Sequence, residues 1–588
     1  MSTVTETTGK WTHRAVLGAL FLGGVLLLYF RNTAPFLHPT LYGEDGLWVA
    51  LGLENGWFYA LTNARPDYFV FLNIILLFLA TQISTWLTES PLTLLPQAIA
   101  VVSLCFFSAL AVFTFVTVKR FSSFLPGLFA FLTVLLMPLG FSVDEIMGRL
   151  LQIGFYMPLL AVLLLFWRDK ISSWRLIFGL DLLLLLCAGT NPLVLAICVC
   201  HLCFDFFKDR NVAACIWRNF TLIVSVLTLT VFLLPRMGGK GGIPGAFVGS
   251  SLVEAVTARS ILYPFLFPWY GELANTVSVL LIGVFACLVV FACRQAGSQE
   301  LKRLTLFTVA TLLIYEAATF IMRPGLTGFL SNYQTTYPDR YFMGINVLAV
   351  FLMALVVARF LSSRGWRVAG GGLAALVLGT YAWGWATLFD TSPMAVNPTL
   401  TFEQQLCLSE VIDGTSSSSV QIYPLQANWL LTMPSRYIDK ENCTYINPDD
   451  VGVARAGDVF RTLPSAPLAA DTPIKLLMTA SHQQEKTGLQ RVGVMFGTYA
   501  RQNVGDAELH LRGPDGAVFF QRFSLSGLAD NQYRYFDLDG KRYTDGEIVS
   551  VSGGGVSSWI SLDAQGVAHT CLIYEYAGGR KKMTPGCS

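Results

Sequence analysis

The chain has 588 residues, of which 54% are hydrophobic and only 13% are charged, and its mean hydropathy is +0.55. A soluble globular domain carries roughly 25% charged residues, so this composition excludes that class. The net charge is only +2, and no basic tract indicates a nucleic acid partner. Repeated apolar runs close to the ~20 residues that cross a bilayer predict a polytopic α-helical membrane protein.

Apolar spans follow one another over the first 390 residues, at 13–30, 68–86, 94–118, 124–140, 152–167, 174–189, 192–207, 219–235, 275–293, 304–322, 341–360 and 367–388. The first span has no small-residue cleavage pattern. We therefore interpret it as a retained helix rather than a signal peptide.

Basic residues orient the spans, because cytoplasmic loops are enriched in Lys and Arg. Lys10 and Arg14 place the N-terminus inside. Later basic clusters fit as inside loops: Lys119-Arg120, Arg168/Lys170/Arg175, Lys208/Arg210/Arg218, Arg294/Lys302/Arg303 and Arg359/Arg364/Arg367. One conflict remains. An odd number of crossings must separate the first outside loop from Lys119 inside, but two apolar spans, 68–86 and 94–118, lie between them. We resolve it by predicting that 68–86 does not cross fully, which gives about eleven crossings and an extracytoplasmic C-terminal part.

Two adjacent carboxylates, Glu44 and Asp45, lie in the first outside loop, within the stretch Tyr-Gly-Glu-Asp-Gly-Leu-Trp that ends at Trp48. One interpretation is a plain helix start, since acids favour a helix N-terminus. The following segment, 47–64, is too polar to span and too apolar to be fully solvated, so it predicts one helix in the membrane interface. Two acids held at the bilayer surface are then candidates for the mouth of an active site.

Charged residues also gather in two later outside loops. Asp144 and Glu145 follow the span that ends near residue 140, with Arg149 one turn on. Such an acid pair can hold a divalent cation, Mg²⁺ or Mn²⁺, through oxygen ligands. The loop before residue 341 contains Arg323 and Arg340, and arginines can neutralise a phosphate. The alternatives are ordinary helix capping for the acids and interfacial anchoring for Arg340.

The outside loop 236–274 opens with a glycine run around Lys240. A phosphate cradle of backbone N–H groups and a flexible hinge both stay open, and the hinge fits better because no G-K-[ST] sequence occurs there. Aromatic residues further along the loop can anchor in the interface or line a site for a sugar or lipid. The candidate substrate-binding residues are Trp48, Arg65, Trp269 and Tyr337.

After residue 390 the sequence becomes polar and rich in turns, with period-two stretches such as 492–499 and 507–512. Short strands at this spacing predict a β-sandwich, jelly-roll-like, over 391–588, with 391–485 as a mixed connector. Residues 1–390 form the membrane domain. If the sandwich binds glycan, the exposed aromatics expected to do so are Tyr499, Tyr533 and Tyr535.

The twelve cysteines divide into two groups. Eight lie in or beside apolar spans, where Cys behaves as a small buried hydrophobe, and the run of Cys198, Cys200 and Cys203 around His201 lacks the usual zinc spacing. The other four predict two disulfides in an oxidising compartment. Proximity in sequence favours the pairs Cys407–Cys443 and Cys571–Cys587.

The acidic motif in the first outside loop, the later acidic loop, the many helices and the outside β-domain together resemble the glycosyltransferase-C superfamily. Pro39 to Gly56 further resembles the bacterial serotype-converting O-antigen glycosyltransferases, in which A-E-D-G follows the first helix. Gly43 stands here in place of that alanine. The resemblance covers about 400 residues loosely, and the likeness of the β-domain to carbohydrate-binding modules, as in the mycobacterial arabinosyltransferases, is architectural.

This resemblance implies an inner-membrane enzyme with a periplasmic β-domain. It would move a sugar, with inversion, from a polyprenyl-phosphate-sugar donor to a surface glycan or lipid-linked acceptor, with Asp45 or Glu44 as the base. The phosphate would be bound by Arg149, Arg340, Arg323 and Lys240, and membrane lipid would surround the helices. Two alternatives stay open: a lipid-linked oligosaccharide ligase or polymerase, and a transporter or non-catalytic glycan-binding protein. Intramembrane candidates for transport are Asn73, Asp181 and Glu316.

Overall fold

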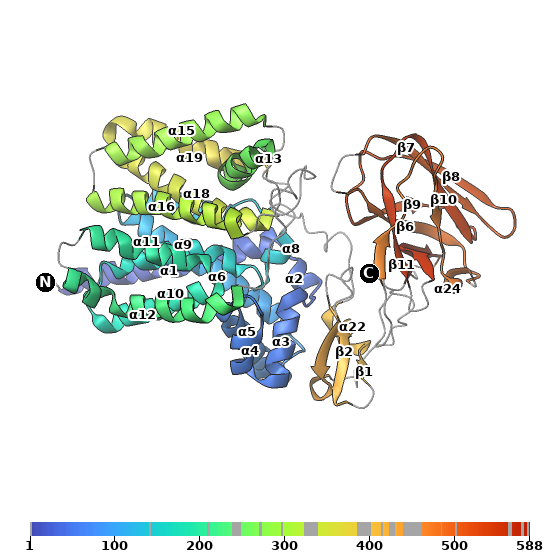
Figure 1. Ribbon diagram of the computed structural model, residues 1–588, viewed down its shortest axis with the longest axis horizontal. Coiled ribbons are helices and arrows are strands. Elements are labelled where there is room, and N and C mark those ends of the chain that lie inside the picture. Colours follow the sequence, from blue (N-terminus) through green and yellow to red (C-terminus); the bar gives the residue numbers. More distant parts are fainter. Residues whose placement is uncertain are drawn as a thin grey trace. The chain divides into compact units, whose positions relative to one another are not determined.

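The structure is a computed structural model that describes residues 3–139, 143–208, 212–237, 249–267, 269, 273–295, 298–322, 339–384, 401–412, 415–422, 430–438, 461–483, 485–499, 503–562, 567–577, 581–584 and 587. The chain forms two compact units. The first, which we call the helical unit, comprises Met1–Pro39, Asn55–Ser331 and Thr335–Pro398. The second, the β unit, comprises Thr40–Glu54, Asn332–Gln334 and Thr399–Ser588 (Figure 1).

The helical unit is built from long apolar helices joined by short segments. Its elements are α1 (Thr3–Arg31), α2 (Ala34–Leu37), α4 (Trp57–Asn63), α5 (Phe71–Thr88), α6 (Leu95–Lys119), α7 (Phe124–Leu136), α8 (Val143–Ile146), the 3₁₀ helix η2 (Ile153–Tyr156), α9 (Met157–Arg168), α10 (Trp174–Thr190), α11 (Leu193–Lys208), α12 (Val212–Met237), α13 (Gly249–Glu254), the π-helix η3 (Ala255–Leu262), α14 (Tyr263–Leu266), α15 (Asn275–Arg294), α16 (Gln299–Met322), α18 (Asp339–Ser362), η5 (Arg364–Trp366) and α19 (Arg367–Trp383).

Every apolar span expected from the sequence falls on one of these helices. Seven helices among the described residues are long and apolar enough to cross a membrane, namely α1, α5, α6, α12, α15, α16 and α18. The structure therefore agrees with a helical membrane part. The number of crossings stays a prediction.

The contacts of α5 bear on the parity conflict. Asn73, in the first turn of α5, donates a hydrogen bond to the carbonyl oxygen of Leu150. Ser103, two turns into α6, donates to the carbonyl oxygen of the preceding residue, Arg149. At the other end of α5, the backbone N–H of Leu94 donates to Ser84 Oγ at 3.1 Å. The first turn of α5 therefore lies beside Leu150, and its last turn lies beside the start of α6. Lys119, the basic residue of α6, is at the other end of that helix. Helix α5 is itself one of the seven helices long and apolar enough to cross, so the partial crossing of 68–86 stays a prediction.

The segment 47–64 forms two helices rather than the single one predicted. Helix α3 (Gly43–Asn55) ends and α4 begins around Gly56, whose φ of +90° is a conformation that few other residues adopt. Helix α3 belongs to the β unit. A Cβ atom at Gly46 would lie 2.9 Å from Leu431 and 3.1 Å from Ile422, so α3 packs closely on the small sheet that carries those side chains.

That small sheet lies within the predicted connector. Its strand order is β1-β2-β3, all antiparallel: β1 (Glu410–Val411), β2 (Ser417–Gln421) and β3 (Leu430–Pro434). The short helix α22 (Phe402–Cys407) precedes it. Thr401 and Gln404 form a reciprocal capping box at the start of α22, which satisfies two backbone N–H groups.

The rest of the β unit consists of two antiparallel sheets. One has the order β5-β10-β7-β8. The other has the order β12-β11-β6-β13-β14, with β4 beside β11 and β9 beside β6. The strands are β4 (Arg461–Pro464), β5 (Ile474–Leu476), β6 (Leu489–Gly497), β7 (Gly505–Arg512), β8 (Val518–Ser524), β9 (Gln532–Asp537), β10 (Asp545–Gly553), β11 (Ser557–Leu562), β12 (Ala568–Thr570), β13 (Leu572–Tyr576) and β14 (Lys581–Met583), and the four-residue helix α24 (Ala480–Gln483) lies before β6.

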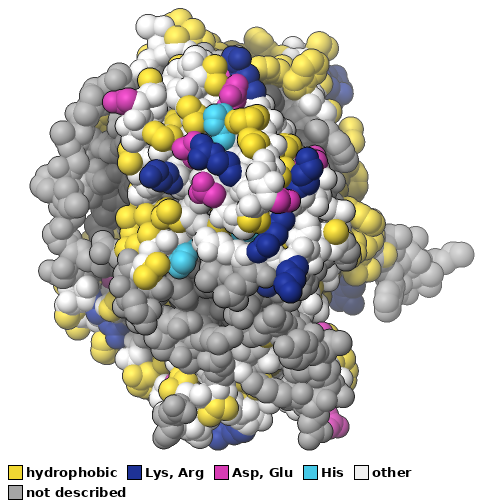
Figure 2. Space-filling view, turned by 90° about the vertical axis from the view of Figure 1, so that its right-hand side faces the viewer, with side chains coloured by type: hydrophobic (Ala, Val, Ile, Leu, Met, Phe, Trp, Pro, Cys, Tyr) yellow, Lys and Arg dark blue, Asp and Glu magenta, His cyan; other side chains and the backbone are white. Residues whose placement is uncertain are grey.

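One core joins the two sheets. Alternate residues of β7, such as Leu509 and Leu511, are fully buried, as are Val492 and Val494 of β6, and all belong to the same cluster. This is the period of two that places every second side chain on one face of a strand. Charged side chains pair on the surface instead, for example Arg512 with Glu547 at 3.0 Å. Figure 2 shows a face of the molecule on which basic and acidic side chains lie interspersed.

The cysteines follow the predicted division. Cys571 and Cys587 form a disulfide, with their Cα atoms 5.1 Å apart, so this predicted pair is confirmed. Cys407 is also disulfide-bonded, and its predicted partner Cys443 lies outside the described residues. The eight cysteines of the helical unit are free thiols. The oxidising location of the β unit stays a prediction.

Candidate functional site

Asp45 is a buried carboxylate at the start of α3. The helix begins at Gly43, with φ of +40°, and its first turn contains both Glu44 and Asp45. Asp45 is 1% exposed, whereas Glu44 is partly exposed. Trp48, one turn on, is 3% exposed. Both interpretations of the motif therefore have support, since the acids start a helix and one of them is also buried.

The burial of Asp45 is exceptional within its unit. Among the described residues of the β unit, it is the one Asp, Glu, Lys or Arg side chain that is buried. Removing a carboxylate from water costs several kcal/mol unless its surroundings compensate. Such a group is rarely kept for packing alone, and it is a candidate for chemistry.

Glu145 and Arg340 are two predicted site residues that the fold brings together. Arg340 Nη1 lies 2.6 Å from Glu145 Oε2, and both side chains are largely buried. The guanidinium also lies over the ring of Tyr341, 5.1 Å from its centroid, and Phe155 meets that ring edge-on. Helix α18 thus begins with an arginine oriented by a carboxylate and an aromatic ring. The Asp144 side chain lies outside the described residues.

Arg149 is also buried, at 2% exposure. The residue before it, Gly148, has φ of +72°, and a Cβ atom there would lie 2.6 Å from Pro35. Only glycine permits both this backbone and this contact. The backbone at Gly148 therefore packs closely against α2, and the Arg149 side chain that follows is buried in the unit. Ser103 Oγ donates a hydrogen bond to the carbonyl oxygen of Arg149 at 2.8 Å.

Two further buried arginines were not predicted from the sequence. Arg31, in the last turn of α1, is 2% exposed and donates to the carbonyl oxygens of Leu135 and Met137. Arg259 is also 2% exposed, pairs with Glu254 at 2.9 Å, and lies in the π-helix η3. Such helices are frequent at functional sites. The missed signal for Arg31 was its place at the predicted outside end of an apolar span, against the positive-inside tendency.

These arginines lie at one end of the helical unit, which we call the arginine end: Arg31, Arg149, Arg259 and Arg340. Asn346, on the same helix as Arg340, donates to the carbonyl oxygen of Arg259 at 2.8 Å. Figure 1 shows α2 and α8 at this end of the unit. Guanidinium groups bind carboxylates and phosphates through paired hydrogen bonds. The arrangement is therefore suited to an anionic ligand.

The other predicted residues of the helical unit have local partners or are not described. Arg65 forms an ion pair with Asp67 at 3.1 Å and lies over Tyr68. Trp269 is 41% exposed, with its ring 6.2 Å from that of Trp383. Lys240, Arg323 and Tyr337 lie outside the described residues.

A divalent cation at Glu145 finds little support in its surroundings. The carboxylate is engaged by Arg340, and among the described residues it belongs to no group of three acids, histidines or cysteines close enough to share a cation. Within the described part of the chain, the one group of acids and histidines close enough to share a cation is Asp169, His201 and Asp205, elsewhere in the unit. No step below uses a cation at Glu145.

The intramembrane candidates for transport have partners as well. Asp181 forms a buried ion pair with Arg168, at 2.5 Å. Asn73 donates to the carbonyl oxygens of Leu150 and Leu151. Glu316 is 6% exposed on α16. Two of the three therefore hold helices together, which is a sufficient reason for their presence.

The aromatic candidates of the β unit differ in exposure. Tyr499 is 40% exposed, and Tyr533 donates its hydroxyl to the carbonyl oxygen of Cys587 at 2.6 Å. Tyr535 lies under the guanidinium of Arg491, 5.7 Å from its ring centroid. Tyr499 is thus the strongest of the three for contact with a ligand.

Comparison of the chain with protein-family models, with curated proteins and with solved structures gives no match. The assignment of function below therefore rests on the motif and on the geometry of the residues.

Proposed function

We propose that this protein is an inner-membrane glycosyltransferase that takes a sugar from a polyprenyl-phosphate-sugar donor and transfers it to a surface glycan or lipid-linked acceptor. The observation that carries this proposal is the burial of Asp45 within the Glu-Asp motif after the first helix. The β unit otherwise keeps its described charges near water. A single buried carboxylate in a motif that resembles the acidic loop of these enzymes is the best candidate for the catalytic base.

In the proposed reaction, the Asp45 carboxylate accepts the proton of the attacking acceptor hydroxyl. The hydroxyl oxygen forms a bond to the anomeric carbon while the bond from that carbon to the phosphate oxygen breaks. The polyprenyl phosphate leaves with the bonding electron pair, and the anomeric configuration inverts. Glu44, which is more exposed, is the alternative base.

The leaving phosphate gains negative charge in this step, and positive groups that are already oriented lower the barrier for such a change. The arginines of the helical unit supply candidates. Arg340 is fixed between Glu145 and Tyr341, and Arg149 is fixed by the passage beside Pro35. As a separate proposal for the helical unit, which does not depend on the position of Asp45, both bind an anionic group such as a phosphate, with Arg31 and Arg259 as further candidates.

The experiment uses a strain that lacks the gene, complemented with variants, and measures the sugar composition of its surface glycan. Asp45→Asn keeps the size of the side chain and removes its charge, so transfer should fall by ~10²–10⁴-fold. Glu44→Gln should have a smaller effect. Glu54→Gln, an exposed residue of the same helix, is the matched control and should behave as the unaltered protein, with equal amounts of each protein in the membrane.

Full transfer by the Asp45→Asn and Glu44→Gln variants, singly and together, would refute the proposal. The type of defect separates the alternatives. Loss of one sugar supports a glycosyltransferase, whereas an altered chain length with unchanged composition indicates a polymerase or ligase. Glycan that accumulates unexported in the cell indicates transport.

A further inference from the structure

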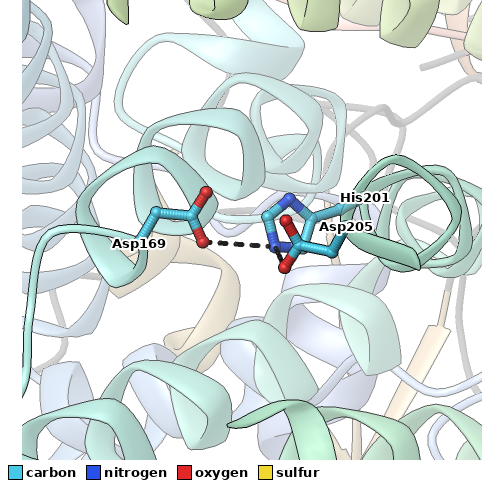
Figure 3. A group of neighbouring side chains, drawn as sticks. All are labelled: Asp169, His201 and Asp205. Carbon is cyan, nitrogen blue, oxygen red and sulfur yellow. Dashed lines mark ion pairs between the residues drawn. The ribbon is translucent and has the colours of Figure 1, made fainter. Parts of the chain in front are cut away.

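A second polar cluster lies at the opposite end of the helical unit from Arg149. Asp169 caps the end of α9, and His201 and Asp205 lie on α11. Because His201 and Asp205 are four residues apart, they project from the same face of the helix. Figure 3 shows the imidazole of His201 with dashed lines to the carboxylates of Asp169 and Asp205. The three ligand atoms lie within 4.8 Å of one another.

The Nε2 nitrogen of His201 forms no hydrogen bond with the described residues around it. The residue is 5% exposed. Nε2 lies 3.6 Å from Asp169 Oδ1 and 3.7 Å from Asp205 Oδ2. Both separations are too long for a hydrogen bond. A buried nitrogen directed at two carboxylates and bonded to neither calls for a third partner.

The distances suit a cation. Zinc binds histidine nitrogen and carboxylate oxygen at ~2.0–2.2 Å in tetrahedral geometry, which sets two ligand atoms about 3.3–3.6 Å apart. The separations from Nε2 are close to this range. A small closing movement of the Asp169 side chain, which is 31% exposed, would bring the third oxygen into place.

Neighbouring side chains form hydrogen bonds to the Asp205 carboxylate, as residues around the ligands of a metal site commonly do. Asp205 accepts hydrogen bonds from Arg218 and from Asn219, the latter at 3.3 Å. Asn219 in turn accepts from Arg168 at 2.8 Å. Such second partners fix the orientation of a ligating carboxylate. The Arg218 side chain is 39% exposed, so it can move toward solvent when a cation binds.

The neighbouring cysteines do not complete a softer site. Cys198 is buried, Cys200 is partly exposed and Cys203 is exposed, so the three thiols point to different sides of α11. This agrees with the expectation from their spacing. The ligand set is one imidazole and two carboxylates, which suits a divalent transition metal.

We propose that Asp169, His201 and Asp205 bind one divalent transition-metal cation, which joins the end of α9 to α11 and leaves a fourth position open to water. The ion would add a link between two helices that already pack against each other. This site is separate from the arginine end, and it does not depend on the proposed transfer reaction.

The test uses the full-length protein in detergent, purified with a tag that does not bind metals. The protein is stripped with EDTA, dialysed against Zn²⁺, and its metal content and binding isotherm are measured. We expect about one equivalent of Zn²⁺. Loading with Co²⁺ instead should give the visible absorption of a tetrahedral site with nitrogen and oxygen ligands.

Two variants on different elements decide the outcome. Asp169→Asn, at a partly exposed helix end, and His201→Gln should each weaken Zn²⁺ binding at least about tenfold. His510→Gln is the matched control, because His510 also faces a carboxylate, Glu508, at 3.2 Å but belongs to no group of three such residues close enough to share a cation in the described part of the chain. It should bind as the unaltered protein does.

Binding of less than about a tenth of an equivalent, or equal binding by Asp169→Asn and the unaltered protein, would overturn the proposal. The cluster would then be a contact of His201 with two carboxylates that holds no cation. If His201→Gln fails to fold, Asp169→Asn and the Co²⁺ spectrum still decide.

Discussion

The helical unit and the β unit bury polar groups in different ways. The helical unit buries whole charges, among them Arg31, Arg149, Arg168, Asp181 and Arg259. Among the described residues from β4 to the C-terminus, the buried polar groups are neutral, such as Thr570, Thr584 and the imidazole of His482. The charged side chains of this part stay near the surface, where many pair with one another.

The difference follows from the surroundings that each unit is expected to have. A charge at the surface of a membrane helix would face lipid, so it is retained only inside the unit and with partners. A charge on a sheet exposed to water costs nothing there and would cost much in the core. Asp45 is the exception within its unit, because its carboxylate is buried. This exception is what makes it a candidate for chemistry.

The largest expected effect tests whether the arginine end acts on a ligand. Arg340→Lys keeps the charge but loses the two-pronged guanidinium. Transfer should fall by ~10²–10³-fold, the usual cost of removing one donor to a developing charge. Arg120→Lys, which alters the exposed ion pair with Glu300 at the other end of the unit, is the control and should stay within about twofold. Equal activity of both variants would make Arg340 a structural residue.

The next effect concerns stability rather than activity. Arg168→Met leaves Asp181 buried without its guanidinium, which should destabilise the helical unit by ~3–5 kcal/mol. Thermal unfolding of the protein in detergent measures this loss. Adding Asp181→Leu removes the orphaned charge, so the double variant should recover most of the stability. If the double variant recovers none of the lost stability, the ion pair of Arg168 and Asp181 stabilises the unit by more than neutralising its two charges.

Much of this fold could be predicted from the sequence, because periodicity is local. The apolar spans and the alternating strands are patterns over ten to twenty residues, and both follow from which faces must be buried. The disulfide between Cys571 and Cys587 joins residues close in the chain. Local signals of this kind need no knowledge of the rest of the structure.

Long-range partners could not be predicted in the same way. Glu145 and Arg340 are 195 residues apart, and nothing in either loop identifies the other. The packing of α3 on the small sheet could not be predicted either, and its place in the membrane interface stays a prediction. An apolar face looks the same in sequence whether it meets lipid or a sheet, and here Gly46 packs against Ile422 and Leu431. The burial of Arg31 and Arg259 likewise depends on helices distant in sequence.

A smaller effect concerns the pH dependence of the stability of the β unit, which the buried His482 is expected to cause. Burial lowers the pKa of His482 from 6.5 to about 4. The ring stacks on Tyr574, and its nitrogens lie 2.6 Å from the Tyr576 hydroxyl and 2.7 Å from the carbonyl oxygen of Tyr543. In the neutral ring Nε2 donates to that carbonyl, and Nδ1 accepts from the hydroxyl.

Because the folded state binds this proton less readily than the unfolded state, His482 favours folding above pH 6.5, and the contribution falls as the pH drops toward 4. The total loss is about 3 kcal/mol. Hydrogen exchange of β6 and β13 in the full-length protein, corrected for the pH dependence of intrinsic exchange, measures it. His482→Asn should flatten the profile, and His510→Gln, at a partly exposed histidine, should not. A flat profile in the unaltered protein would contradict the assignment.

The smallest effect asks whether the β unit also binds glycan. Tyr499 is exposed and has φ of +57°, which is uncommon for a non-glycine residue and is kept where surrounding contacts enforce it. Here Ser557 Oγ donates to its hydroxyl at 2.6 Å, and Asp530 accepts from its backbone N–H at 3.1 Å. Nearby, Trp559 donates to Asn531, which also has a positive φ. Two aromatic rings are thus held by polar contacts, as a stacking surface for a sugar requires.

If this surface binds surface polysaccharide, Tyr499→Ala should weaken binding of the full-length protein by ~0.5–1.5 kcal/mol, since one ring face contributes about that much to stacking. Phe520→Ala is the control, because Phe520 is 61% exposed on β8 of the other sheet. It removes a comparable exposed ring and should leave the affinity unchanged. Equal losses from both variants would show that exposed aromatic area, rather than the fixed geometry around Tyr499, determines binding. The strained backbone would then have a purely structural cause in the turn after β6.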